Sequence, residues 1–218
     1  MRETAQDKAY SILKERILSL SLAPGTVIST RETAISLALG ITPTREALIR
    51  LEREGLIEIK PQKEIQVTRI KRGRVATERF LRETLESGVF DIFLDKKSTA
   101  DLIELDSIIA RQAEAMAEGD NQKLFDLDNL FHSIFFSSAS MLSLFKVIEE
   151  NSPNYSRLRL LSLNAEGIAE GVITDHINIL RALETDDVSS ARSLLKNHLV
   201  KCDSTYGIIT ELFPAFLE

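Results

Sequence analysis

The sequence contains a single cysteine, Cys202, so no disulfide bond can form within the chain. Disulfides belong to oxidising compartments, and one cysteine fits a reducing cytoplasm. No run of apolar residues approaches the ~18 that cross a bilayer, and the first ten residues are polar and charged, unlike a secretory signal. We therefore expect a cytoplasmic protein that does not enter a membrane.

Glycine and proline are also scarce, at nine and five residues in 218. Because both residues interrupt helices, their scarcity permits long helices over most of the chain. A hydrophobic content of 44% and a charged content of 28% are ordinary for a globular protein. At this length we expect one or two domains with a sizeable core.

The net charge of −6 is unevenly distributed along the chain. Residues 1–70 hold 11 Lys and Arg against 9 Asp and Glu, whereas the remainder holds 16 against 24. A mildly basic segment joined to an acidic one suits a protein whose first part contacts phosphates and whose second part does not.

Residues 1–70 predict three short helices. Apolar residues at helical spacing indicate the first, and a Ser-x-x-Glu capping pattern beginning at Ser29 indicates the second. For the third, the sequence predicts Thr42 as the N-cap, Pro43 at the first helical position and an end at Gly55.

Two segments of alternating apolar and polar residues, 56–60 and 64–70, follow the third helix and predict a β-hairpin. Three helices and a hairpin make up a winged helix-turn-helix, whose third helix enters the major groove of DNA. A small helical domain for protein contacts is the alternative. The side chains expected to contact DNA are Thr42, Thr44, Arg45, Arg50 and Lys63.

After a basic linker, 71–74, the sequence predicts helices and no strands. The expected spans are 75–95, 98–118, 120–139, 141–151, 154–164, 168–185 and 187–212, with N-caps at Ser98 and Asp187. The fold class is therefore mainly α. We divide the chain into a winged domain, 1–70, the linker, and an all-helical domain, 75–218.

Each of the three histidines lies on an apolar helical stripe. His132 follows Asp128 by four residues, which puts both on one helix face, and His176 and His198 lie on two later helices. A lone histidine on such a face more often packs in the core than binds a metal. Because every histidine repeats this pattern and one carboxylate, Asp128, lies at the right offset, we favour a transition-metal or anion site.

Strings in both parts of the chain resemble the GntR family of bacterial transcription regulators, in the FadR-like branch with an FCD effector domain. The N-terminal strings are Pro24-Gly25, Thr42-Pro43-Thr44-Arg45-Glu46-Ala47-Leu48 and Arg50-Leu51-Glu52-Arg53-Glu54-Gly55-Leu56. The C-terminal ones are Arg82-Glu83-Thr84-Leu85-Glu86, Asp128 with His132, His176, and His198-Leu199. The resemblance covers nearly the whole chain.

The resemblance implies a homodimeric regulator, usually a repressor, that binds an operator and responds to a metabolite. It also implies that the Asp128, His132, His176 and His198 set holds a divalent metal such as Zn²⁺ or Ni²⁺. A small carboxylate effector would complete the coordination, with Arg82 as its anion partner.

Two positions depart from the family's pattern. Ile41 replaces an arginine that usually contacts DNA, and Glu64 follows Lys63 where the wing usually carries Arg-Gly. A DNA-incompetent relative that binds a metal or metabolite therefore stays open as an alternative. So does a hydrolase-like metalloenzyme, since a metal with open positions activates water, although the sequence has no HExxH motif.

Overall fold

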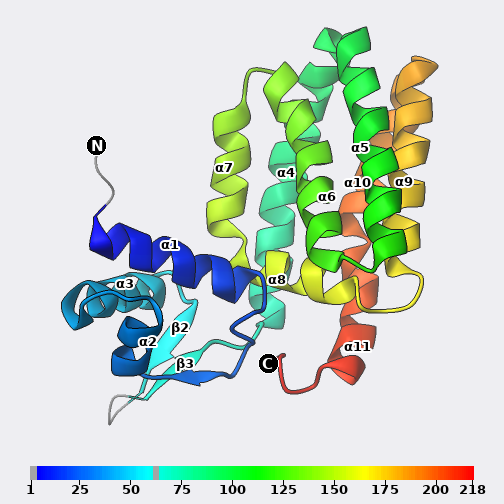
Figure 1. Ribbon diagram of the computed structural model, residues 1–218. Helices are drawn as coiled ribbons and strands as arrows, with labels where there is room; N and C mark the ends of the chain where they lie inside the picture. The colour runs from blue at the N-terminus through cyan, green and yellow to red at the C-terminus, as the bar shows by residue number, and fades with distance from the viewer. Residues whose placement is uncertain (1–3, 61–63) are drawn as a thin grey trace. The chain divides into compact units, whose positions relative to one another are not determined.

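The computed structural model describes residues 4–60 and 64–218, without the side chains of residues 202–204. Helices dominate it, which confirms the mainly α fold class (Figure 1). The chain forms two compact units, Met1–Arg72 with Phe213–Glu218 and Gly73–Leu212. We call them the winged unit and the helical unit.

The winged unit has three helices and a small sheet. In chain order the elements are α1 (Ala5–Leu18), β1 (Val27–Ile28), α2 (Thr30–Ser36), α3 (Ile41–Arg53), β2 (Ile57–Ile59) and β3 (Ile65–Val67). The predicted hairpin forms, and β1 adds a third strand in the antiparallel order β1-β3-β2. The core is apolar and includes Leu13, Ile17, Leu48, Leu51, Leu56 and Val67.

Local capping explains where these helices begin and end. The Ser29 side chain accepts a hydrogen bond from the Glu32 N–H and caps α2, as predicted. The predicted N-cap of α3 was wrong, because the helix begins at Ile41 with Gly40 as its N-cap. Pro43 then lies within the first turn, where N–H groups have no partner inside the helix and a missing one costs little.

The last six residues belong to the winged unit. Leu217 forms a parallel β-bridge with Ile70, and the Ile70 N–H donates to the Phe216 carbonyl at 2.9 Å. Ile70 and Leu217 are both buried. The sequence had placed residues 213–218 with the helical domain, and it had predicted a linker at 71–74 where a helix in fact begins at Arg72.

The helical unit is a bundle. Its helices are α4 (Arg72–Lys96), α5 (Thr99–Glu118), α6 (Asn121–Ser138), α7 (Leu142–Asn151), α8 (Pro153–Ser162), α9 (Ile168–Glu184), α10 (Val188–Val200) and α11 (Cys202–Leu212). The predicted spans agree to within a few residues, except that the last one is two helices separated at Lys201. Both predicted N-caps form, and Ser98 makes a capping box with Asp101.

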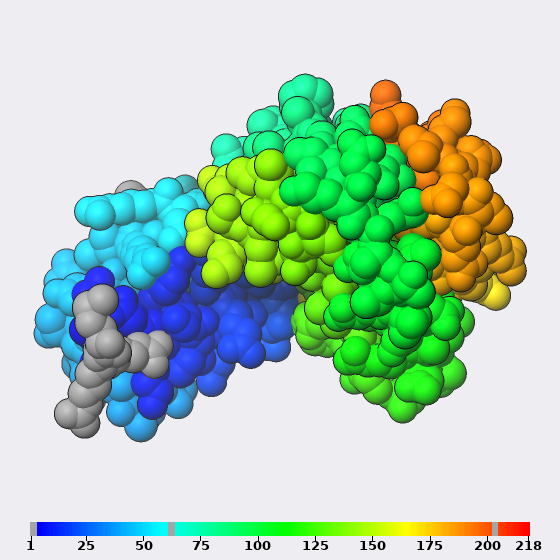
Figure 2. Space-filling view, turned by 90° about the horizontal axis from the view of Figure 1, so that it is seen from above, coloured from blue at the N-terminus to red at the C-terminus, as the bar shows by residue number. Residues whose placement is uncertain are grey.

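An aromatic cluster holds α6 against α4 in the core of this unit. The Phe135 ring lies 4.8 Å from that of Phe90 and 4.9 Å from that of Phe93, between centroids. Figure 2 looks down onto the helical unit from the top of Figure 1, the end at which α5 begins. The Lys97–Asp186 ion pair joins the α4–α5 and α9–α10 connections. The aromatic cluster thus fixes α6, which carries Asp128 and His132, against α4, which carries Arg82 and Glu86.

Among the described helices, none is both long and apolar enough to cross a membrane.

Candidate metal centre and nucleic-acid interface

Three helices bring the four predicted ligands into one buried cluster. Asp128 and His132 come from α6, His176 from α9 and His198 from α10. One ligand atom from each residue lies within 4.8 Å of the others. His132 and His176 are fully buried, which separates this cluster from ordinary surface acidic groups.

An acceptor oxygen lies beside the Nδ1 atom of every histidine in the cluster. The pairs are His132 with Glu86, His176 with Gln112 at 2.9 Å, and His198 with Asp175 at 3.2 Å. An oxygen acceptor fixes the imidazole proton on Nδ1 and leaves the Nε2 lone pair for a metal. All three rings therefore have the tautomer and the orientation of metal ligands.

The Nε2 atoms face one another and the Asp128 carboxylate. His132 Nε2 lies 3.2 Å from His198 Nε2, and His176 Nε2 lies 3.6 Å from Asp128 Oδ1. His176 Nε2 has no hydrogen-bond partner among the described residues. Lone pairs and a carboxylate oxygen repel at such distances unless a cation lies among them. The residues present thus fit a divalent metal ion.

Burial and neighbouring charges keep these groups in their metal-binding protonation states. Burial lowers the pKa of His132 to about 4, against the attraction of Glu86. Burial also lowers the pKa of His176 well below its usual range. At Asp128 burial acts the other way, but the neighbouring Arg159 guanidinium holds the pKa of the carboxyl well below its usual range. Neutral imidazoles and an ionised carboxylate are ready ligands at neutral pH.

The charged side chains around the cluster form three ion pairs. They are Arg82 with Glu86 at 3.0 Å, Lys201 with Asp175 at 2.9 Å, and Arg159 with Asp128. The positive and negative charges cancel within each pair, and the histidines add no charge when neutral. A divalent ion would therefore leave the site with a net positive charge, which favours an anionic ligand.

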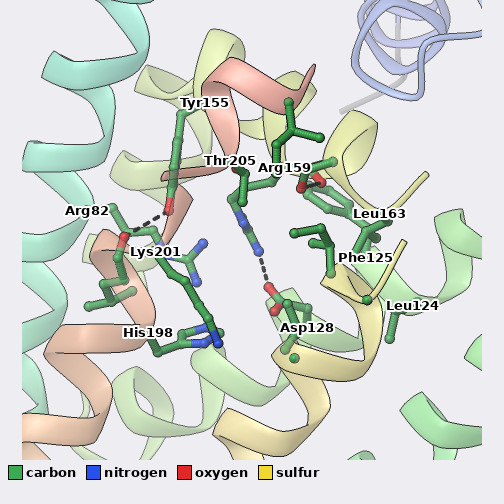
Figure 3. A pocket seen from close by; sticks show the side chains of 17 residues that line it. Arg82, Leu124, Phe125, Asp128, Tyr155, Arg159, Leu163, His198, Lys201 and Thr205 are labelled. Atoms are coloured by element: carbon green, nitrogen blue, oxygen red, sulfur yellow. Dashed lines mark hydrogen bonds and ion pairs between the residues drawn. The ribbon is translucent and has the colours of Figure 1, made fainter. Parts of the chain in front are cut away.

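A cavity of about 320 Å³ borders the cluster (Figure 3). Arg82, Asp128 and His198 reach it from the cluster side, and aliphatic and aromatic side chains form much of the remaining wall. The Nη2 atom of Arg82 is buried and has no hydrogen-bond partner among the described residues. The volume lies at the lower end of the range for small-molecule sites.

Most of the residues that support the four ligands were not predicted from the sequence. Glu86 lies in a string that resembles the family, but its contact with His132 was not expected. Gln112, Arg159, Asp175 and Lys201 were not predicted as site residues. Gln112 had a detectable signal, because it is a polar residue on an otherwise apolar face of α5, between Ile109 and Ala115.

The N-terminal end of α3 carries two exposed residues of the predicted DNA-contact set. Thr42 and Arg45 are exposed there, next to Ile41, which is 58% exposed. Thr44 is fully buried, and its hydroxyl donates to the Gly40 carbonyl at 2.9 Å. Because the Thr44 side chain is buried, it is not placed to make the predicted contact with DNA.

Two other predicted DNA-contact residues lie elsewhere. Arg50 is also exposed, but its guanidinium lies 3.5 Å from the centroid of the Tyr10 ring and pairs with Glu54, so it is engaged within the winged unit. Lys63 falls outside the described residues, and Glu64 beside it is exposed. The structure thus presents Thr42 and Arg45 most directly to a partner in solution.

Two family models match the chain. The one described as bacterial regulatory proteins, gntR family, matches residues 5–67, and the FCD domain matches residues 79–201. These segments fall in the winged unit and the helical unit respectively. The second contains all four cluster residues.

Whole-chain relatives agree with these matches. An uncharacterized HTH-type transcriptional regulator in an unstable DNA locus of Streptomyces ambofaciens is 32% identical over 87% of this chain and 80% of the relative. The HTH-type transcriptional repressor RspR of Escherichia coli is 26% identical over 90% of this chain and 86% of the relative. The structure of E. coli McbR/YncC shares the fold, with a TM-score of 0.76 at 22% identity over 96% of this chain and 99% of that one.

The match of both units to a regulator family excludes the hydrolase-like alternative. The chain belongs to the GntR family of DNA-binding transcription regulators, in the FadR-like branch that carries a C-terminal FCD domain.

Proposed function

We propose that this regulator is a cytoplasmic repressor whose operator affinity is set by a small carboxylate bound at a metal centre in the helical unit. The observation that carries the proposal is the convergence of three imidazole Nε2 atoms and one carboxylate beside a cavity. The E. coli relative that is named a repressor supports the direction of regulation.

Asp128, His132, His176 and His198 are the proposed metal ligands. Imidazole and carboxylate ligands suit Zn²⁺ and Ni²⁺, which are the ions we propose. The metal would supply positive charge and open coordination positions to the effector. The protein's own contribution is to hold the rings by their Nδ1 atoms and to keep the cluster out of solvent.

Arg82 is the proposed anion partner of the effector. Its Nε atom donates to Glu86, which fixes the guanidinium, while the buried Nη2 atom has no hydrogen-bond partner among the described residues. An unsatisfied buried donor is costly, and a carboxylate that accepts from it removes that cost. The effector can change operator affinity only by binding one state of the protein more tightly than another.

Thr42 and Arg45 are the proposed operator contacts that the structure describes best, and Lys63 remains a proposed backbone contact. Residues at the N-terminal end of a recognition helix lie nearest the base edges. We propose a homodimer, so that two copies of α3 read two half-sites of a pseudo-palindrome. Arg50 would have to leave Tyr10 to join them.

Metal analysis of untagged protein, purified without added metal, tests the centre. We expect about one transition-metal ion per chain in the wild type and little in His198→Ala. Asn197→Ala is a matched control, because Asn197 is an exposed neighbour on the same helix. Equal metal content in both variants, with both folded, would refute the proposed ligand set.

A further inference from the structure

We infer that the effector is a monocarboxylate with an apolar body rather than a polyhydroxylated acid. This inference rests on the proposed function, because it takes the metal cluster and Arg82 as the place where the carboxylate head binds. It goes further by naming the chemistry of the rest of the ligand. The evidence is the distribution of satisfied and unsatisfied polar atoms around the cavity (Figure 3).

The unsatisfied polar atoms lie at one end of the site. Among the described residues, Arg82 Nη2 and His176 Nε2 are buried without a hydrogen-bond partner. Arg82 lines the cavity, and His176 belongs to the cluster behind it. With the metal bound to His176, a ligand therefore still finds one unpartnered donor, Arg82 Nη2, beside the cluster where a carboxylate head would sit.

The other polar side chains of the wall already have partners within the protein. Ser162 donates to the Arg159 carbonyl at 2.7 Å, and the Tyr155 hydroxyl donates to the Leu199 carbonyl at 3.4 Å. The Arg159 guanidinium donates to Asn129 at 3.1 Å and to Asp128. Lys201 donates to both oxygens of Asp175, at 3.0 and 2.9 Å. Thr205 also interacts within the protein.

A hydroxylated ligand would gain little from such a wall. Each of its hydroxyl groups would lose water and would find wall donors that already have acceptors within the protein, which is unfavourable. An apolar body faces the opposite situation. It would lie against a surface that includes Leu124, Phe125, Leu163, Ile168, Val172 and Ile208, and each buried methylene should tighten binding by about fourfold.

Isothermal titration of the zinc-loaded full-length protein with hexanoate and gluconate tests the inference. The two acids share one six-carbon skeleton, and gluconate carries a hydroxyl on every carbon beyond the carboxylate. We expect hexanoate to bind about 100-fold more tightly, and the series from propanoate to hexanoate to tighten by about fourfold per methylene. Equal or tighter binding of gluconate, a flat series, or no binding of hexanoate would overturn the inference.

Val172→Thr tests the wall itself, because it replaces a methyl group with a hydroxyl at nearly constant volume. We expect this variant to reduce the hexanoate-to-gluconate affinity ratio several-fold. Val147→Thr, at a 40% exposed position on α7, is the matched control and should leave the ratio unchanged. A ratio that is the same in both variants would contradict the assignment of the wall.

Arg82→Gln and zinc-free protein separate this inference from the proposed function. Both should weaken hexanoate and gluconate alike, because both alter the head of the site and not its wall. If gluconate is preferred and its binding requires zinc, the inference fails and the proposed function stands. If hexanoate binds equally well without zinc and in Arg82→Gln, the proposed function fails.

Discussion

The winged unit and the helical unit place their charged side chains in opposite ways. In the winged unit the core is apolar, and pairs such as Arg50 with Glu54 remain partly exposed. In the helical unit Glu78, Arg82 and Glu86 are almost completely buried on α4. Burying charge costs several kcal/mol per ion before pairing recovers part of it. The helical unit thus gives up stability for a preorganised site, whereas the winged unit keeps its charged side chains at the surface.

Helix α4 organises this buried charge at intervals of four residues. Glu78 accepts from the N–H groups of Asn154 and Tyr155 at 2.7 and 2.9 Å and so caps α8. Arg82 reaches the cavity one turn later, and Glu86 holds His132 one turn after that. The same face of α4 therefore caps α8 through Glu78, provides the proposed anion partner Arg82, and holds the metal ligand His132 through Glu86.

The largest expected effect comes from removing one member of a buried pair. Glu86→Gln leaves Arg82 buried without its charge partner, and we expect metal-free protein to lose about 3–5 kcal/mol in the free energy of unfolding. Denaturant titration measures it. Asp91→Asn is the control on the same helix, because the Asp91–Arg192 pair is more than half exposed and should contribute little. Similar losses of stability in Glu86→Gln and Asp91→Asn would show that the buried pair contributes no more than the exposed one.

The second prediction uses pH to separate the two units, because all three histidines lie in the helical unit. Burial lowers the pKa of His132 to about 4 in the folded protein, while an unfolded histidine titrates near 6.5. The unfolded chain therefore binds the proton first, and stability falls as the pH drops from 6.5 towards 4. For His132 the loss should reach roughly 3 kcal/mol in metal-free protein.

Hydrogen exchange between pH 6.5 and 5, corrected for the intrinsic rates, locates this loss. We expect protection to fall in the helical unit and to stay constant in the winged unit. A uniform fall in both units would show that buried histidines do not cause it.

A smaller effect is expected from deleting residues 213–218. The deletion uncovers Ile70, which is 0% exposed, and removes the acceptor of its N–H. We expect the winged unit to lose about 1–3 kcal/mol, measured as faster hydrogen exchange in β1, β2 and β3. Faster exchange confined to the helical unit would contradict the assignment of the tail to the winged unit.

The smallest expected effect is at the DNA surface. Arg45→Ala should weaken binding to a duplex selected from a random library by about tenfold, since one base or phosphate contact is lost. The control is Arg53→Ala, which removes the same charge at the opposite end of α3. Its effect on DNA binding should be much smaller. Equal effects of the two variants would indicate general charge attraction and not a specific role for Arg45.

Local sequence patterns predicted the helices and the β-hairpin. Most of the features they missed depend on pairing between residues far apart in the chain. The four-residue spacing of Asp128 and His132 fixed their shared face, because helical periodicity is local. The partner of His132 lies 46 residues away at Glu86, and nothing local reveals it. The β1 strand was missed because two residues show no alternation, and the Ile70–Leu217 bridge because its halves lie at opposite ends of the chain.

The Thr42-Pro43 error has a different cause. That pair is a strong local signal for a helix start, and Gly40 has no side chain to compete as a cap. The structure begins α3 at Ile41 because Gly40 adopts an extended conformation and its carbonyl accepts from both Thr44 N–H and Thr44 hydroxyl. A side-chain bond back to the backbone outweighed the capping preference.

X-ray absorption at the zinc edge of the zinc-loaded protein tests the central claim most directly, because it reports the atoms bound to the metal. The buried cluster predicts imidazole scattering from three histidines together with oxygen ligands. Binding of hexanoate should change the oxygen component and leave the imidazole component unchanged. A spectrum dominated by oxygen or sulfur, with fewer than three imidazoles, would contradict the claim that Asp128 and the three histidines of the helical unit bind the metal.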